Sequence, residues 1–283
     1  MTRKLFLFTL FAIPLFSFLL ISPVCADTET FNKTYQVEPY TKLELRNRNG
    51  GVTVQRWDQS EVKIIAVKKT GWGGKLDNVE IKVHQGDTMT IETIHLVSNP
   101  RVSVTYDIRV PSGVIVNYVS SSNGKIDLTG THGNAIVETS NGKINIENIS
   151  GDIKASTSNG KILIKDIKGF VSAETSNGGI NIINIGGINR IETSNGSIET
   201  EIPMIQDDIF IKTSNGSLKL HLPRGLNANI ELKTSNGKIR LHDLEIVVSE
   251  ISKSKIKGRI GDGGKRIYGK TSNGSIDLYE LRR

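Results

Sequence analysis

The tripeptide Ser-Asn-Gly recurs through the second half of the chain at a nearly fixed interval. Its copies begin at Ser122, Ser140, Ser158, Ser176, Ser194, Ser214, Ser235 and Ser272. The first five copies are spaced by 18 residues, and the later intervals are 20, 21 and 37 residues. Such a period is typical of solenoids, in which each repeat buries its apolar face only by stacking on its neighbours.

Within each repeat, aliphatic side chains occupy the second and fourth positions after the glycine, as in Ile144 and Ile146 or Ile162 and Ile164. This is the period of a β-strand. A second glycine and a second alternating run then lead back to the next motif. We therefore predict an all-β fold, a parallel β-helix (β-solenoid) of about 18-residue rungs, whose handedness the repeat leaves open. A β-propeller does not fit this pattern, because it needs four strands in each repeat.

Stacking gives the motif a structural interpretation. We expect its asparagines to form a ladder at a buried corner, each amide donating to the next. The ladder comprises Asn123, Asn141, Asn159, Asn177, Asn195, Asn215, Asn236 and Asn273. The glycine is expected to supply a positive φ or a close backbone approach. Thr157, Thr175 and Thr193 share the parity of inward residues, which predicts a hydroxyl ladder at the edge of the core.

Residues 1–26 have the pattern of a secretory signal peptide. Arg3 and Lys4 precede an apolar stretch, and small residues precede Asp27. We expect cleavage after Ala26 and export to the periplasm, the cell surface or the medium. Lipidation at Cys25 is the weaker alternative, because Ser22 stands where a lipoprotein signal has a leucine-like residue. An uncleaved membrane anchor is the other alternative.

Residues 27–115 lack the motif but keep strand alternation, as in residues 79–83 and 102–108. We predict that they form irregular N-terminal β rungs that cap the regular β-helix of residues 116–283. The interval of 37 residues is two rungs long. It therefore predicts a degenerate rung near Ser254-Lys255-Ile256.

Charge is unevenly distributed along the chain, whose formal net charge is +7. Residues 211–283 hold 15 basic and 7 acidic side chains, whereas residues 27–210 hold 19 and 22. The candidate anion-binding residues are Lys253, Lys255, Lys257, Arg259, Lys265, Arg266 and Lys270. The first four alternate along one expected strand and so share a face. Such a patch attracts anions, or it protects a terminal edge from strand addition.

Two pairs of residues on consecutive motif repeats raise the question of catalysis or metal binding. Glu174 and Glu192 share an outward phase, which places them about 5 Å apart, as in retaining glycosidases. A solvated face with Arg190 nearby is the interpretation that we favour. His221 and His242 also share a phase and offer two metal ligands, but no carboxylate partner is evident. We expect no catalytic residue, no cofactor and no metal.

The chain resembles the bacterial putative-adhesin β-solenoid domains of unknown function, which are related to head GIN domains. The resemblance rests on the segments Leu43-Glu44-Leu45 to Asn49-Gly50 and Val110-Pro111-Ser112-Gly113, and on the repeated Ser-Asn-Gly-Lys-Ile pattern. It covers most of the chain after residue 26. It implies the solenoid fold and an adhesin-like role, and it transfers no catalytic residue.

These observations favour an exported, non-enzymatic module that binds an anionic partner. The expected partner is an anionic glycan, lipopolysaccharide or a membrane surface, or alternatively a protein; export argues against nucleic acid. A structural or scaffolding protein of the envelope is the second hypothesis. A polysaccharide-active β-helix enzyme is the third.

Overall fold

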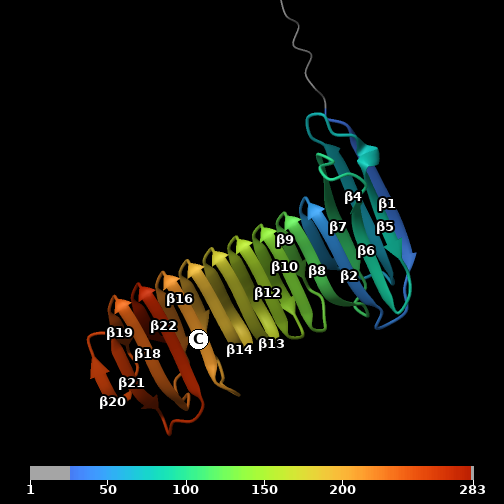
Figure 1. The fold of residues 1–283 in the computed structure, drawn as a ribbon. Coiled ribbons are helices and arrows are strands. Elements are labelled where there is room, and N and C mark those ends of the chain that lie inside the picture. The colour runs from blue at the N-terminus through green and yellow to red at the C-terminus, as the bar shows by residue number, and fades with distance from the viewer. Residues whose placement is uncertain (1–25, 282–283) are drawn as a thin grey trace, which may run out of the picture.

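The protein is a two-layered β-solenoid, described over residues 26–281 of a computed structural model (Figure 1). Each regular rung contributes one strand to each layer. We call the layer whose strands end at the motif asparagines the motif layer, and the opposite one the second layer. The predicted all-β solenoid is confirmed.

The motif layer consists, in spatial order, of β5 (Val79–His84), β6 (Thr88–His95), β2 (Lys42–Asn49), β8 (Ile115–Asn123), β10 (Ala135–Asn141), β12 (Ile153–Asn159), the second halves of β13 (Ile162–Asn177) and β14 (Ile180–Asn195), β16 (Ile209–Asn215), β22 (Arg266–Asn273), β18 (Ala228–Asn236), β21 (Lys255–Ile260) and β20 (Val247–Ser252). Its central strands are parallel, and the strands added at its two ends are antiparallel.

The second layer consists, in the same direction, of β1 (Thr28–Gln36), β4 (Glu61–Thr70), β7 (Val102–Val110), β3 (Val52–Arg56), β9 (Ile126–Thr129), β11 (Ile144–Ile149), the first halves of β13 and β14, β15 (Ile198–Glu201), β17 (Leu218–Leu222), β23 (Ile276–Glu280) and β19 (Ile239–His242). A short 3₁₀ helix, η1 (Leu76–Asn78), precedes β5.

Equivalent residues of successive rungs are register partners, so Ile144 lies beside Ile162 and Ile162 beside Ile180. Their side chains point between the layers and are buried. One continuous apolar core therefore extends through the stack. The strict alternation of the repeat is what fixes this register, because a slip of one residue would turn every isoleucine to the solvent.

The motif glycines permit a close approach of neighbouring rungs. A Cβ atom on Gly178 would lie 1.9 Å from the carbonyl oxygen of Gly160, and the other motif glycines are similarly crowded. None of the motif glycines has a positive φ. Of the two roles expected for them, the close approach is therefore the one that operates.

The asparagine ladder forms, but it is exposed to solvent. Each amide Nδ2 donates to the Oδ1 of the neighbouring rung at 2.8 Å, from Asn123 through Asn177 to Asn236, and Asn49 begins the series. All these asparagines except the partly exposed Asn49 are exposed. The predicted buried corner was wrong, because the asparagine is the last residue of its strand, where the chain begins to turn and the inward alternation has already ended with the threonine.

The threonine of the motif supplies the buried polar contact at this corner. Thr175 is 3% exposed, and its hydroxyl donates to the carbonyl oxygen of Gly160 at 3.2 Å. The threonines of the other rungs repeat this bond with the glycine of the adjacent rung. The predicted inward orientation is confirmed, but the acceptor is a backbone carbonyl rather than another hydroxyl.

The rungs at the C-terminal end do not follow chain order. Strand β22 lies between β16 and β18, so Asn273 is inserted between Asn215 and Asn236. In the same way, β23 lies between β17 and β19. The intervening segment forms the antiparallel hairpin β20–β21, which continues the motif layer beyond β18. The predicted degenerate rung near Ser254-Lys255-Ile256 is therefore wrong.

The N-terminal region combines one regular rung with an antiparallel extension. Strands β2 and β3 form the first rung, and β8 and β9 stack directly on them. The segment between β3 and β8 and the preceding strand β1 form the outer strands. The structure thus places a regular rung inside the segment 27–115 that we predicted to be irregular.

A buried hydrogen-bond network ties this first rung to its extension. The Asn47 amide donates to the carbonyl oxygens of Gly50 and Val104, and the Thr93 hydroxyl donates to its Oδ1. The Tyr106 hydroxyl lies 2.7 Å from that of Thr93. Burial raises the pKa of Tyr106 to about 12, so this phenol stays protonated.

The predicted signal peptide, including Cys25, lies almost entirely outside the described residues. Residues 26–281 contain no helix that is long and apolar enough to cross a membrane.

The glycine contact can be tested by substitution. Gly178→Ala places a methyl group against the Gly160 backbone, which cannot move without separating two rungs. We expect this variant to lose more than about 3 kcal/mol in the free energy of unfolding, measured by denaturant titration. Gly86→Ala is the control, since its Cβ would meet nothing nearer than 3.8 Å. Equal effects of the two changes would contradict the close-approach argument.

The two polar ladders should differ in their contribution to stability. Thr175→Val leaves the partly buried Gly160 carbonyl without its hydroxyl donor, for which we expect a loss of about 1–3 kcal/mol. Asn177→Ala interrupts bonds between exposed amides, which water replaces, so its loss should be below about 1 kcal/mol. Thermal and denaturant unfolding of both variants measures the difference. A larger loss for Asn177→Ala would refute this ranking.

Candidate functional site

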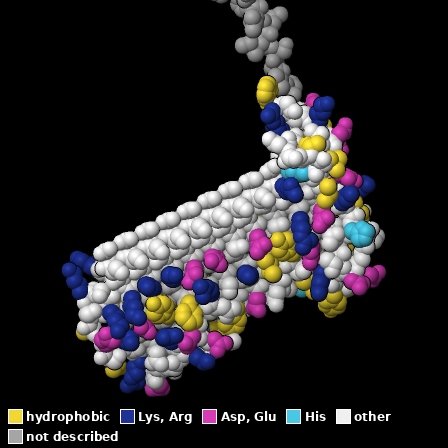
Figure 2. Space-filling view, viewed as in Figure 1, with side chains coloured by type: hydrophobic (Ala, Val, Ile, Leu, Met, Phe, Trp, Pro, Cys, Tyr) yellow, Lys and Arg dark blue, Asp and Glu magenta, His cyan; other side chains and the backbone are white. Residues whose placement is uncertain are grey.

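On the outer face of the motif layer, the charged side chains occupy only part of the width of the face. Figure 2 shows an uncharged ridge along the motif corner, and charged side chains below it and at the two ends of the solenoid. At the C-terminal end, Lys and Arg lie among acidic and apolar side chains. This C-terminal part of the outer face, on β16, β22, β18, β21 and β20, is called the basic face below.

Strand β21 presents its basic residues to one side, as the sequence indicated. Lys255, Lys257 and Arg259 alternate with Ile256 and Ile260, which are buried. Lys253 does not share this strand, since it lies in the turn between β20 and β21. The predicted alternation therefore holds for three of the four residues.

Acidic side chains lie between these cations. The Glu231 carboxylate is 2.6 Å from Lys233 Nζ, 3.5 Å from an Arg266 nitrogen and 3.9 Å from Lys257 Nζ. The hydrogen bond from Lys233 holds the pKa of Glu231 below its usual value, and Lys257 and Arg266 add to this shift. The mutual repulsion of the cations on β21 is thus offset within the chain.

Glu250 has the same role at the outer edge of the basic face. Its carboxylate lies 2.7 Å from Lys255 Nζ and 3.9 Å from Lys257 Nζ. The hydrogen bond from Lys255 lowers the pKa of Glu250. Lys255 and Lys257 of β21 are therefore held in place by their acidic neighbours.

The remaining predicted cations come from the segment before β22 and from β22 itself. Lys265 pairs with Asp207 at 3.1 Å, and Arg266 pairs with Asp208 at 3.4 Å. The Arg266 guanidinium also lies 5.7 Å from the ring centre of Phe210 and 5.9 Å from that of Tyr268. Lys270 makes no ion pair with any described residue.

The structure adds residues to this site that sequence reasoning missed. Lys270 is the register partner of Lys212 on one side and of Lys233 on the other. Phe210 and Tyr268 are likewise cross-strand partners, with ring centroids 6.1 Å apart. Strand alternation indicated that each of them faces outward. Their proximity depends on the insertion of β22, which the repeat spacing did not reveal.

The lysines of β21 do not lie on the terminal edge of the layer. Strand β21 pairs with β18 on one side and with β20 on the other, whereas β20 pairs with no second described strand. The exposed apolar residues of β20 are Val247, Val248 and Ile251, and its one charged residue is Glu250. Edge protection by the β21 lysines therefore loses its structural basis.

Glu174 and Glu192 are register partners on adjacent strands, as their shared phase predicted. Arg190 forms an ion pair with Glu192 at 2.9 Å. This arrangement fits the solvated face that we favoured over a catalytic pair.

The two histidines cannot share a metal ion in this arrangement. Tyr279 lies between them, with its ring centroid 5.2 Å from that of His221 and 4.4 Å from that of His242. His221 contacts Glu199 at 3.3 Å, and His242 contacts Asp277 at 3.2 Å. No group of three potential metal ligands occurs among the described residues.

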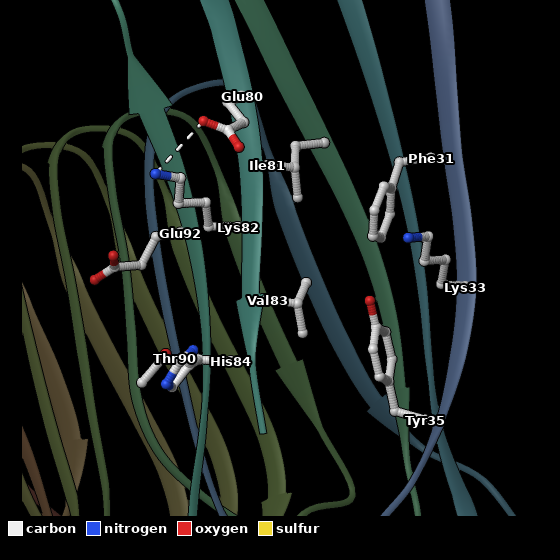
Figure 3. A pocket seen from close by; sticks show the side chains of 10 residues that line it. All are labelled: Phe31, Lys33, Tyr35, Glu80, Ile81, Lys82, Val83, His84, Thr90 and Glu92. Atoms are coloured by element: carbon white, nitrogen blue, oxygen red, sulfur yellow. Dashed lines mark ion pairs between the residues drawn. The ribbon is translucent and has the colours of Figure 1, made fainter. Parts of the chain in front are cut away.

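Hollows occur at both ends of the solenoid. Phe31 and Tyr35 of β1 face Ile81 and Val83 of β5 across a hollow of about 430 Å³ (Figure 3). Burial raises the pKa of Tyr35. A wider hollow of about 950 Å³ lies between residues 223–226 and 243–247 at the C-terminal end. The first hollow opens between β1 and β5, the outermost strands of the two layers, and the second opens where strands end.

Comparison with known families identifies the chain. The model of the Toastrack DUF4097 family matches residues 40–279. The chain belongs to this family. The Toastrack match begins before the first regular rung and ends within β23, so it includes the repeats and the N-terminal extension except for β1. No curated protein matches the chain.

Solved structures similar to this Toastrack chain share little sequence with it. A putative adhesin from Bacteroides fragilis is 14% identical, covers 88% of this chain and 97% of its own, and has a TM-score of 0.49. A putative adhesin from Parabacteroides merdae is 11% identical, with coverages of 90% and 97% and a TM-score of 0.30. A putative cell adhesion protein from Clostridium sporogenes is 12% identical, with coverages of 89% and 100% and a TM-score of 0.25.

The ion-pair cluster around Glu231 makes a prediction for its titration. Lys233→Met removes the largest cause of the lowered pKa, so the midpoint of Glu231 should rise toward that of an ordinary glutamate. Lys212→Met is the control, because Lys212 makes no ion pair with Glu231. NMR titration of the glutamate carboxyl carbons measures both.

The same shift has a consequence for stability. A carboxylate with a lowered pKa in the folded state stabilises that state above its unfolded pKa, and the effect is lost as the pH falls through the folded value. The Lys233→Met variant should therefore lose less stability on acidification than the parent. An unchanged Glu231 midpoint in this variant would contradict the proposed cluster.

Proposed function

We propose that this Toastrack protein is an exported, non-enzymatic, adhesin-like module whose basic face binds an anionic polymer or an anionic surface of the cell envelope. The observation that carries the proposal is the concentration of cations on neighbouring strands at one end of a rigid stack. Long-range attraction by such a cluster raises the local concentration of anions.

The arrangement of the cations supports binding rather than a purely internal role. Glu231 and Glu250 hold Lys233, Lys255 and Lys257 in defined positions, but they offset only part of the positive charge. The five strands of the basic face carry seven Lys and Arg residues against two Glu residues. A partner with several negative charges complements this excess.

The chemistry of the remaining surface supports a non-enzymatic role. The candidate acid pair Glu174 and Glu192 lies beside Arg190 on an outer face. Four hollows of the described residues lie at the two ends of the stack and on its outer faces, and none of these four is lined by this pair. Catalysis of glycan cleavage needs an acid and a base arranged about a bound sugar.

A structural role in the envelope is the second candidate. The observation in its favour is the edge strand β20, where Val247 is 59% exposed and Ile251 is 71% exposed. Strands of this kind readily pair with other chains. A scaffolding protein needs no anionic ligand, so the adsorption experiment separates the two candidates.

Adsorption of residues 27–283 to immobilised anionic glycan and to vesicles rich in phosphatidylglycerol tests the proposal. We expect adsorption to weaken steeply as salt is raised, because screening shortens the reach of exposed charges. Lys255→Ser, Lys257→Ser and Arg259→Ser together should reduce it about tenfold or more. Their folding should persist, since these side chains point outward.

The matched control changes three exposed lysines of the middle rungs to serine, namely Lys154, Lys161 and Lys168. It removes the same charge at another place, and its adsorption should stay within about threefold of the parent. Glycan recovered after adsorption should keep its length. Adsorption that is independent of salt, or equal losses in the two triple variants, would overturn the proposal.

A further inference from the structure

Four lysines from four separate segments form a single row on the basic face. Lys212 of β16 is the register partner of Lys270 of β22, which pairs with Lys233 of β18, which in turn pairs with Lys255 of β21. Neighbouring strands are ~4.8 Å apart, so the row spans about 14 Å across the strands. We call these four residues the lysine row.

The two halves of the lysine row differ in their contacts. Lys233 and Lys255 pair with Glu231 and Glu250 at 2.6 and 2.7 Å. Lys212 and Lys270 make no ion pair with any described residue. Two adjacent, unpaired ammonium groups repel one another, and a bound anion would offset this repulsion.

The lysine row is bordered by two surfaces of different chemistry. Two residues back along the strands lie Phe210 and Tyr268, whose rings are tilted by 53°. Two residues further on lies the serine of each motif, followed by the exposed asparagine ladder with its fixed amides. On β18 the same place is held by Glu231, so the cations lie between the aromatic pair and an uncharged hydrogen-bonding ridge only at Lys212 and Lys270.

We propose that the lysine row binds a linear acidic polysaccharide that carries one carboxylate on each sugar. This inference rests on the proposed function and specifies its ligand. A sugar unit of an extended chain is about as long as one strand spacing, so its carboxylates recur in step with the strands, and those on the side that faces the protein meet the lysine row. The chain therefore runs across the strands, along the axis of the solenoid.

The bordering surfaces recognise the rest of each sugar. An aromatic ring presents a large apolar surface to the C–H face of a sugar. Each ladder asparagine keeps one amide hydrogen and one oxygen lone pair free for sugar hydroxyls, because the ladder uses only one of each. Lipid headgroups in a fluid bilayer have no fixed spacing and gain nothing from the register of the lysines.

Polygalacturonate and its oligomers, from dimer to octamer, are the probes. Binding to residues 27–283 is measured by calorimetry or by fluorescence anisotropy. We expect affinity to rise with length up to about four sugars, the number that spans four strands, and then to level off. Lys212→Ser with Lys270→Ser should weaken tetramer binding about tenfold, and Phe210→Ser should weaken it through loss of the apolar contact.

The control variant Lys154→Ser with Lys161→Ser removes the same charge away from the lysine row and should leave tetramer binding within about twofold. An equal loss in both double variants, or affinity that rises with length without a plateau, would overturn the inference. Binding to vesicles that contain phosphatidylglycerol is measured in parallel with binding to the oligomers. If they bind and the oligomers do not, this inference fails while the proposed function stands. If neither binds, both fail.

Discussion

The contact between the backbones of successive rungs at the glycine corner is the constraint on which the rest of the structure depends. The carbonyl of Gly160 lies where a side chain of Gly178 would be, and the Thr175 hydroxyl donates to that same carbonyl. Backbone, side chain and rung spacing are therefore fixed together at one point of each turn. The isoleucines then stack in register, because the corner leaves no freedom for a slip.

This fixed register turns single residues into rows. A side chain at a given phase lies one strand spacing from its equivalents, so the chemistry of a rung is repeated or changed in steps along the stack. In the middle rungs the outward phase carries Glu174 and Glu192, and it continues into Lys212 and Lys270 toward the C-terminal end. The surface charge thus changes sign along a single row.

The sequence was sufficient for the solenoid, the strand phases and the partners within the asparagine ladder as far as Asn215, because each of these follows from period and parity. It was not sufficient for the order of the last rungs. All motif copies present similar edges, so spacing alone does not tell whether Asn236 stacks on Asn215 or on Asn273. The lysine row and the separation of His221 from His242 by Tyr279 both depend on that order.

The burial of the motif asparagines was the second feature that the sequence did not predict correctly. Parity applies inside a strand, and it correctly placed Thr175 inward. Asn177 ends the strand at the turn, where the alternation no longer determines direction.

The insertion of β22 and β23 also bears on the order in which the molecule assembles. Strands β18 and β19 precede the strands that join them to the stack, so they reach their final neighbours only after β22 and β23 have been made. Folding along the chain can proceed rung by rung only as far as β17. The final rungs must therefore form at the same time. Strands β22 and β23 then hold β18 and β19 to the stack and keep this rung from fraying.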